Sequence, residues 1–188
     1  AGTGIDFFVS ELSDLSDENP YVVIALGAAH STKKMPYSLL RQLCRSIKLP
    51  IVTIGGPKEQ ELGHRLEEEF DNVKNLAGQC SLHQSAHIVQ NGLALITPDT
   101  GMMHIAAALK KPILVFWGNT IPDFGMFPYY GVKEIAYFSA ETEVSCRPCS
   151  KIGYPNCPKG HFKCMEDQNV QAAMSWLENL IKSTNAEQ

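Results

Sequence analysis

Four short apolar runs, partly made of β-branched residues, recur along the chain and end near Gly, Pro, Asp or Asn. They are Tyr21–Leu26, Ile51–Ile54, Leu93–Thr97 and Ile113–Trp117. Runs that are apolar without alternation are typical of strands buried on both faces of a sheet. A further strand is expected around Val132–Phe138.

The segments between these runs carry apolar residues at helical spacing, and a last such segment follows near the C-terminus. The stripes are Leu39–Ile47, Leu62–Phe70, Ser81–Val89, Asp99–Leu109 and Val170–Ile181. Ser81 and Gln84 have the spacing of a capping box. Because strands and helices alternate, the sequence predicts an α/β fold with a parallel sheet and flanking helices.

The length and composition favour one globular domain. The chain has 188 residues, of which 44% are hydrophobic and 19% charged, which argues against wholesale disorder. Residues 1–20 end in an acidic, Ser- and Asp-rich stretch closed by Pro20. We therefore expect a linker or surface arm at 1–20 and a domain at 21–188.

Charge and apolar run length exclude some classes of protein. The net charge of the chain is -4, whereas nucleic-acid-binding proteins typically carry a basic surface. We therefore expect no nucleic-acid partner. No apolar run approaches the roughly 18 residues of a membrane span. The N-terminal residues resemble no signal peptide and begin without Met, so we expect an internal cut in a longer protein.

Glycine-rich and polar segments directly follow the predicted strands. They cover residues 27–34, 55–61, 98–104 and 118–119. Ligands of open parallel sheets bind outside the carboxyl ends of the strands. Since strand packing requires none of the glycines, hydroxyls, lysines, acids or histidine found here, we expect a ligand site at this edge.

The sequence Asp99-Thr100-Gly101 opens a predicted helix and indicates an anion site. Asp99 would cap the helix by accepting hydrogen bonds from amides one or two residues into it. The backbone N–H groups of Thr100 and Gly101 would then face a phosphate at the positive end of the helix dipole. His104, about one turn later, could face the same ligand. A plain helix cap followed by a buried histidine fits the local pattern equally well.

Two other segments carry residues suited to a nucleotide. Lys33, in a short loop that begins with glycine, can reach a diphosphate as a point charge, although a surface lysine is an alternative. Gly55 and Gly56 precede Glu59 and Glu61, which could meet ribose hydroxyls. A Gly/Pro turn with a helix cap explains that segment equally well. Neither a Rossmann glycine fingerprint nor a P-loop is present.

A cysteine-rich loop is predicted at residues 146–164. Its thiols are Cys146, Cys149, Cys157 and Cys164. Cys-x-x-Cys is half of a typical zinc site, and two more cysteines complete four ligands. His161 could replace one ligand. Structural zinc is one interpretation, and disulfides or buried free thiols are the others.

The motifs occur in an order that resembles glycosyltransferase family 9, the family of the ADP-heptose:lipopolysaccharide heptosyltransferases. The order is Gly-x(5)-Lys-x-x-Pro at 27–36, IGGPKE at 54–59, NLAG at 75–78, DTGMMHIAAAL at 99–109 and WG at 117–118. The resemblance covers about Tyr21 to Tyr130, and residues 99–108 are its most specific part. Met35 stands where members of the family often carry Trp.

The resemblance implies a Rossmann-like domain that is the C-terminal, nucleotide-sugar-binding half of a GT-B glycosyltransferase. It implies that Thr100 and Gly101 bind the donor diphosphate, supported by Asp99 and His104, and that Lys33 neutralises the phosphates. Gly55, Gly56, Glu59 and Glu61 would form the ribose and base site. The catalytic base would lie in an N-terminal domain, so no catalytic residue is assigned here.

The expected reaction moves a heptose-like sugar from an ADP- or UDP-linked donor to a lipopolysaccharide-type glycolipid acceptor. No DxD metal motif is present, so we expect no catalytic cofactor, with structural zinc as the one metal considered. We expect a cytoplasmic protein and leave open peripheral binding at the inner face of the inner membrane. The alternatives are a zinc-stapled interaction domain without enzymatic activity and half of another GT-B enzyme, such as a sugar-nucleotide epimerase.

Overall fold

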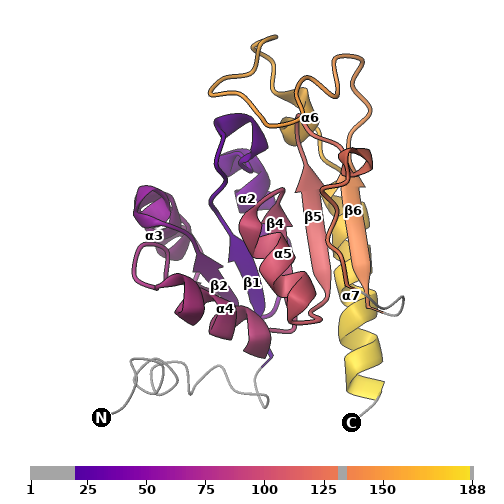
Figure 1. The fold of residues 1–188 in the computed structure, drawn as a ribbon. Helices are drawn as coiled ribbons and strands as arrows, with labels where there is room; N and C mark the ends of the chain where they lie inside the picture. Colours follow the sequence, from indigo (N-terminus) through magenta and orange to yellow (C-terminus); the bar gives the residue numbers. More distant parts are fainter. Residues whose placement is uncertain (1–19, 131–134, 187–188) are drawn as a thin grey trace.

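A computed structural model describes residues 20–130 and 135–186, and the strands of this part form one six-stranded sheet. The strands are β1 Val22–Ala25, β2 Ile51–Ile54, β3 Val73–Asn75, β4 Ala94–Pro98, β5 Ile113–Trp117 and β6 Tyr137–Glu141. Their order is β3-β2-β1-β4-β5-β6 and every neighbouring pair is parallel (Figure 1). The predicted α/β fold with a parallel, Rossmann-like sheet is confirmed.

The strand order places a crevice beside β1. Val22 pairs with Ile51 of β2 on one side and with Ala94 of β4 on the other, so these three strands begin at one level. The connections after β1 and β4 leave the sheet in opposite directions, since β2 and β5 lie on opposite sides of this pair. Ligands bind at such a switch point in open α/β sheets.

Helices cover both faces of the sheet. One face packs against α2 Tyr37–Ser46, α3 Gln60–Glu69, α6 Lys163–Glu166 and α7 Val170–Ala186, and the other against α4 Leu82–Asn91 and α5 Gly101–Ala108. Short 3₁₀ helices at Ser31–Lys33 (η2), Pro57–Glu59 (η3) and Pro122–Phe124 (η4) follow β1, β2 and β5.

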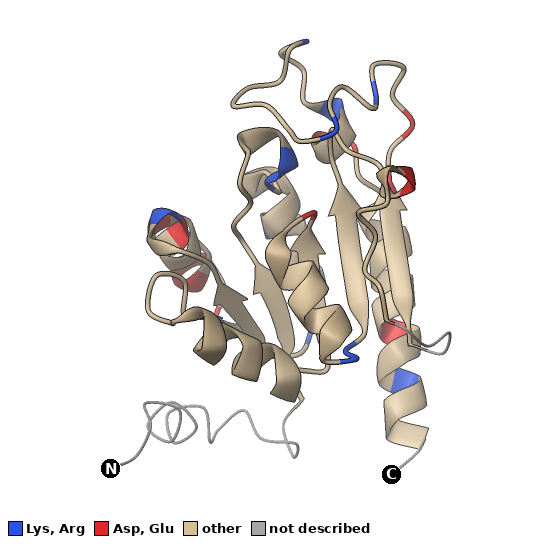
Figure 2. Ribbon diagram, in the orientation of Figure 1, with Lys and Arg blue, Asp and Glu red and all other residues tan. Residues whose placement is uncertain are grey.

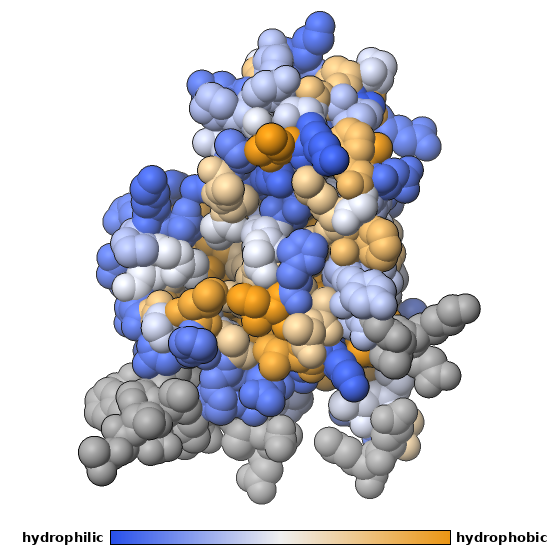
Figure 3. Space-filling model, viewed as in Figure 1, coloured by the Kyte–Doolittle hydropathy of each residue, from blue (hydrophilic) through white to orange (hydrophobic). Residues whose placement is uncertain are grey.

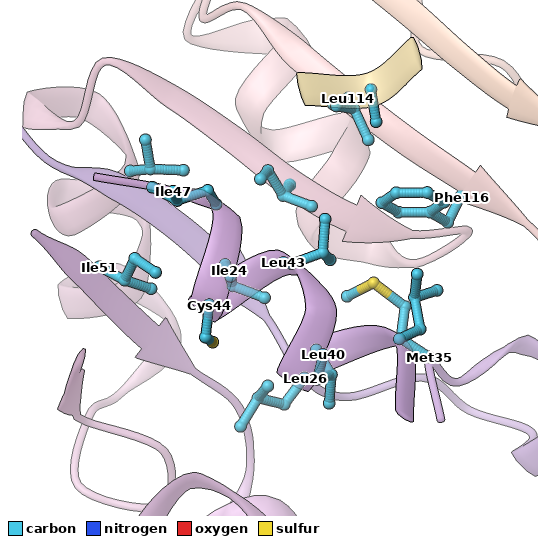
Figure 4. Close-up of a cluster of buried hydrophobic side chains, with 14 of the residues drawn as sticks. Ile24, Leu26, Met35, Leu40, Leu43, Cys44, Ile47, Ile51, Leu114 and Phe116 are labelled. Atoms are coloured by element: carbon cyan, nitrogen blue, oxygen red, sulfur yellow. The ribbon is translucent and has the colours of Figure 1, made fainter. Parts of the chain in front are cut away.

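The apolar stripe of α2 shows how these helices are held. Leu40, Leu43 and Cys44 of α2 belong to one buried cluster with Ile24 of β1 and Phe116 of β5 (Figure 4). All residues of β1 and β5 are buried, because helices lie on both sides of these strands. This double burial is the physical reason for the non-alternating apolar runs.

The structure differs from the predictions at several elements. The edge strand β3 was not predicted. The last strand, β6, extends past the predicted end at Phe138 to Glu141, and its pairing with β5 starts at Ile113 and Tyr137. The predicted helix 99–109 begins two residues later, at Gly101. The predicted cysteine-rich loop ends earlier, because Cys164 lies in α6.

Some predictions fall outside the described residues. The predicted arm at 1–20 does so apart from Pro20, and so do residues 131–134 of the predicted last strand. Among the described residues, no helix combines the length and apolar character needed to cross a bilayer.

Candidate functional site

A cavity of about 250 Å³ opens at the carboxyl ends of β1, β2 and β4. Its lining residues are Ala25, Gly27, Ile54, Gly55, Gly56, Cys80, Leu82, Ser85, Thr100 and Met102. Apolar surface gathers over α4 and α5, the helices that contribute Leu82 and Met102 (Figure 3). The structure thus brings the predicted residues Gly55, Gly56 and Thr100 together around one cavity, with a mainly apolar wall.

The start of α5 lies at this cavity, but Thr100 and not Asp99 caps the helix. Thr100 has extended backbone angles, and its hydroxyl accepts a hydrogen bond from the Met102 amide at 3.0 Å. Gly101, the first helical residue, is exposed, and a Cβ at this position would meet no heavy atom within 4 Å. The positive end of the helix dipole therefore faces open space that an anion can enter.

Asp99 is instead engaged in a buried polar cluster. Its Oδ2 atom lies 2.7 Å from the Lys33 ammonium and accepts a hydrogen bond from the Thr120 hydroxyl at 2.8 Å. The side chains of Lys33 and Asp99 are only 11% and 6% exposed. These two bonds explain why Asp99 does not cap the helix. An ammonium has three hydrogens, so the Lys33 group can donate to a further acceptor.

The cluster joins three connections that the sheet brings to one edge. Lys33 follows β1, Asp99 follows β4 and Thr120 follows β5. Figure 2 shows basic residues in the connection between β1 and α2, and an acidic residue at the turn between β4 and α5. Thr120 was not predicted as a site residue, although it also lies just after a buried strand, as Lys33 and Asp99 do.

Glu59 is held by protein groups on both carboxylate oxygens. Oε1 accepts a bond from the Lys34 ammonium at 2.6 Å, and Oε2 accepts one from the Gly56 amide at 3.0 Å. Glu59 is 8% exposed, whereas Glu61 is exposed. The structure therefore favours a capping role for Glu59, which links the connection after β1 to that after β2, and the ribose role of Glu59 or Glu61 stays a prediction.

His104 lies one turn into α5 and is exposed. The alternative interpretation of a buried, packing histidine is therefore wrong for this residue. Its exposed position on the helix that begins with Gly101 leaves its ring accessible to a ligand, and its predicted role beside the diphosphate stays a prediction.

Cys80 and Ser85 also line the cavity and were not predicted as site residues. Burial raises the pKa of the Cys80 thiol to about 11. The thiol is therefore uncharged at neutral pH and contributes an apolar surface rather than a nucleophile. Cys80 directly precedes Ser81, whose capping box with Gln84 is confirmed, so the helix start places it at the edge of the sheet.

The cysteine-rich segment lies beyond the carboxyl ends of β5 and β6 (Figure 1). The Cys146 sulfur is 3.6 Å from Nε2 of His161, and the Cys149 thiol donates to the Cys146 carbonyl at 3.0 Å. All the cysteines of the described ranges are free. In these same ranges, no three His, Cys, Asp or Glu side chains are grouped so that they could hold a metal ion. The zinc interpretation therefore stays a prediction.

The thiols of this segment differ in their surroundings. Burial, with charge repulsion from the other thiols, raises the pKa of Cys164 to about 11. At Cys157, burial acts to raise the pKa, but backbone N–H groups directed at the sulfur lower it below its usual value. These amides belong to Phe162, Lys159, Gly160 and His161. The fold therefore stabilises a thiolate at Cys157 but not at Cys164.

Comparison with known proteins agrees with the fold and the order of the motifs. The Salmonella typhimurium lipopolysaccharide heptosyltransferase 2 is 30% identical over 119 residues, which are 58% of this chain and 34% of that protein. The structure of E. coli ADP-heptose lps heptosyltransferase II matches with a TM-score of 0.73 and 21% identity, over 98% of this chain and 53% of that one. The structure of E. coli heptosyltransferase WaaC with ADP matches with a TM-score of 0.60 and 22% identity, over 94% and 48%.

The chain thus spans about a third of the length of that curated relative and about half of the two solved structures. The sequence model of glycosyltransferase family 9 (heptosyltransferase) matches residues 6–156, which is most of the chain. With the predicted motifs lying together at one edge of a parallel sheet, this match shows that the chain belongs to glycosyltransferase family 9.

Proposed function

We propose that this chain binds the nucleoside diphosphate of a sugar donor, and that the protein to which it belongs transfers a heptose-like sugar to a lipopolysaccharide-type glycolipid. The observation that carries the proposal is the joint position of the Lys33 ammonium and the open N-terminus of α5. Lys33 bonds to Asp99, the residue just before the helix cap Thr100, so its ammonium lies close to the start of α5.

These groups suit the chemistry of glycosyl transfer. Breaking the bond between the sugar and the diphosphate leaves negative charge on the departing phosphate oxygens. Helix-end amides and an ammonium that are already in place stabilise this charge as it develops, without reorganising in the reaction. Asp99 offsets part of the charge of Lys33, so the amides of Thr100 and Gly101 supply the rest of the stabilisation.

The cavity beside α5 supports the assignment of a nucleoside. It is bounded by Gly55 and Gly56 on one side and Met102 on the other, and a mainly apolar wall suits a base or a ribose face. A structure similar to this chain, E. coli heptosyltransferase WaaC, holds ADP, which favours ADP over UDP as the nucleotide. Membership of the family also favours a glycosyltransferase over an interaction domain or an epimerase half.

The donor reaction as proposed needs no cofactor, since the leaving phosphate is stabilised by protein groups. The catalytic base and the acceptor site are assigned to the part of the protein that lies outside this chain. A glycolipid acceptor would bring the enzyme to the cytoplasmic face of the inner membrane.

Calorimetric titration with ADP and UDP tests the donor site. Gly101→Val places a branched side chain where the phosphate must approach, and we expect ADP binding to weaken on the order of tenfold, equivalent to about 1.4 kcal/mol. Ala108→Val, at the exposed far end of the same helix, is the matched control and should bind ADP like the wild type. Equal ADP affinity in the wild type and Gly101→Val would place the diphosphate elsewhere.

A further inference from the structure

Residues 142–162, which we term the strap, join β6 to α6 without forming a helix or strand. The strap lies at the carboxyl edge of the sheet, above β5 and α6 in the view of Figure 1. It contains most of the cysteine-rich sequence and is not part of the cavity wall. Apart from those to the adjoining ends of β6 and α6, its hydrogen bonds to the rest of the molecule go to Thr32 and to the turn at 118–120.

The first attachment is to Thr32, the residue before Lys33. The Thr32 hydroxyl donates to the Tyr154 carbonyl at 3.0 Å and accepts from the Tyr154 amide at 2.8 Å. The Thr32 amide donates to the same carbonyl at 3.2 Å. Thr32 is 2% exposed, so water cannot replace these bonds easily. Thr32 thus holds the connection after β1 against the strap through hydrogen bonds.

Gly153 brings the strap backbone close enough for these bonds. Its φ of +124° favours glycine, and a Cβ at this position would overlap the side chain of His30. The approach of the strap at 153–154 is therefore specified by the sequence as well as by hydrogen bonds.

The second attachment is to the turn that carries Thr120. The Arg147 side chain, 8% exposed, donates to the Gly118 carbonyl at 2.7 Å and to the Thr120 carbonyl at 2.9 Å. It also bonds to the Glu141 carboxylate at 2.9 Å. A guanidinium that donates hydrogen bonds to two buried carbonyls of one turn holds that turn in one conformation. This turn places the Thr120 hydroxyl on Asp99.

Both attachments lead to the same ion pair. The first ends one residue from Lys33, and the second ends on the residue whose hydroxyl bonds to Asp99. Lys33 itself belongs to η2, a single 3₁₀ turn without a side-chain cap, so little within that turn fixes where the ammonium lies. The strap adds a restraint from outside the turn, beside the bonds of Lys33 to Asp99 and of Lys34 to Glu59.

We propose that the strap is the positioning element of the diphosphate site, with Thr32 as a positioning residue that acts through Lys33. The inference rests on the proposed donor site. A small displacement of a charged group from the position required by the ligand costs binding and rate. Loss of the Thr32 hydroxyl should therefore weaken nucleotide binding even though Thr32 touches no ligand.

A double-mutant cycle on the full chain, with ADP as the probe, tests this. Lys33→Ala should weaken ADP binding at least about fivefold, as expected for loss of a bond to a charged group. Thr32→Val, which keeps the volume and removes the hydroxyl, should weaken it about three- to tenfold. In the Lys33→Ala background, Thr32→Val should add less than about twofold. Thr32→Ser retains the hydroxyl and should restore the affinity.

Unchanged ADP affinity in Thr32→Val overturns the inference, and so does an equal weakening in both backgrounds, which would show that Thr32 does not act through Lys33. Unchanged affinity in Lys33→Ala overturns the donor site itself and the inference with it. The two failures are thus distinguishable.

A second double-mutant cycle combines Arg147→Met, at the second attachment, with Lys33→Ala. It tests the proposal even if Thr32→Val does not fold. Arg147→Met keeps the side-chain stem but loses the bonds from the guanidinium to the Gly118 and Thr120 carbonyls, while the bonds of Asn119 to Cys149 and Ser150 remain. Its effect on ADP affinity should also vanish in the Lys33→Ala background, and an effect that persists there contradicts the proposal.

Discussion

Polar side chains at the carboxyl edge are held by partners from distant parts of the sequence. Lys33 meets Asp99, and Lys34 meets Glu59. Burying an isolated charge is costly, and for the buried Lys33 and Asp99 this cost is reduced because the two side chains lie beside each other. At the scale of single residues, the site is therefore a set of pairs, and removing one member leaves the other uncompensated.

Gly63 offers a test of packing at this scale. A Cβ at this position of α3 would overlap the amide of Asn75, which is buried at 1% exposure. Asn75 cannot easily move, because its Oδ1 atom accepts bonds from the Thr53 hydroxyl at 2.9 Å and from the Ala77 amide at 3.0 Å. We expect Gly63→Ala to lower the free energy of unfolding by about 1–3 kcal/mol, the usual cost of overpacking.

Urea unfolding measures this effect, and Gly101→Ala is the control. Both changes add one methyl group to a glycine of a helix, but the methyl at 101 meets open space. Equal unfolding midpoints for Gly63→Ala and Gly101→Ala would show that α3 can shift away from β3.

At the scale of elements, burial on two faces decided which parts could be predicted. The buried strands β1 and β5 are visible as apolar runs, and the Ser81 capping box marks the start of α4. β3 has three residues and exposes Lys74, so it leaves almost no hydropathy pattern. The short helix α6 follows Pro- and Gly-rich sequence and is held by tertiary contacts of Met165 with the core, which no local pattern reports.

The candidate site, too, could be predicted only in part. Its position was predictable, because loops after buried strands must meet at one edge. The pairing of Lys33 with Asp99, the cap at Thr100 and the role of Thr120 depend on how separate loops pack, and no local spacing encodes them. The limit of prediction from sequence is clearest in the strap. The spacing of its cysteines suggested zinc but did not indicate its contacts with Thr32.

The predicted structural zinc belongs to the strap and to α6. If the four predicted thiols bind zinc, elemental analysis should find about one metal per chain, and Cys149→Ser should release it and loosen the strap. The thermal midpoint should then fall in Cys149→Ser but not in Ser145→Ala, a neighbouring exposed position. A metal-free preparation as stable as one supplied with zinc would leave thiol packing or disulfides as the explanation.

At the scale of the molecule, the described residues contain both a folded core and all the residues of the proposed nucleotide site. The sheet has an apolar cluster on each face, and the proposed donor site is built from connections within this chain. Burial of this extent supports folding of a chain of this length without another domain. Binding and catalysis can therefore be separated experimentally.

We predict that the 188-residue chain binds ADP but transfers no sugar. A positioned general base contributes about 100- to 10,000-fold to such a reaction, and both the base and the acceptor site are assigned outside this chain, which matches about a third of the length of a curated heptosyltransferase. The test incubates the chain with ADP-heptose and a lipopolysaccharide acceptor lacking heptose, and follows ADP release and acceptor mass. ADP binding by calorimetry on the same preparation shows that the donor site is intact. Transfer at a rate above that of the Gly101→Val variant would contradict the prediction, because it would require the catalytic base to lie within residues 1–188.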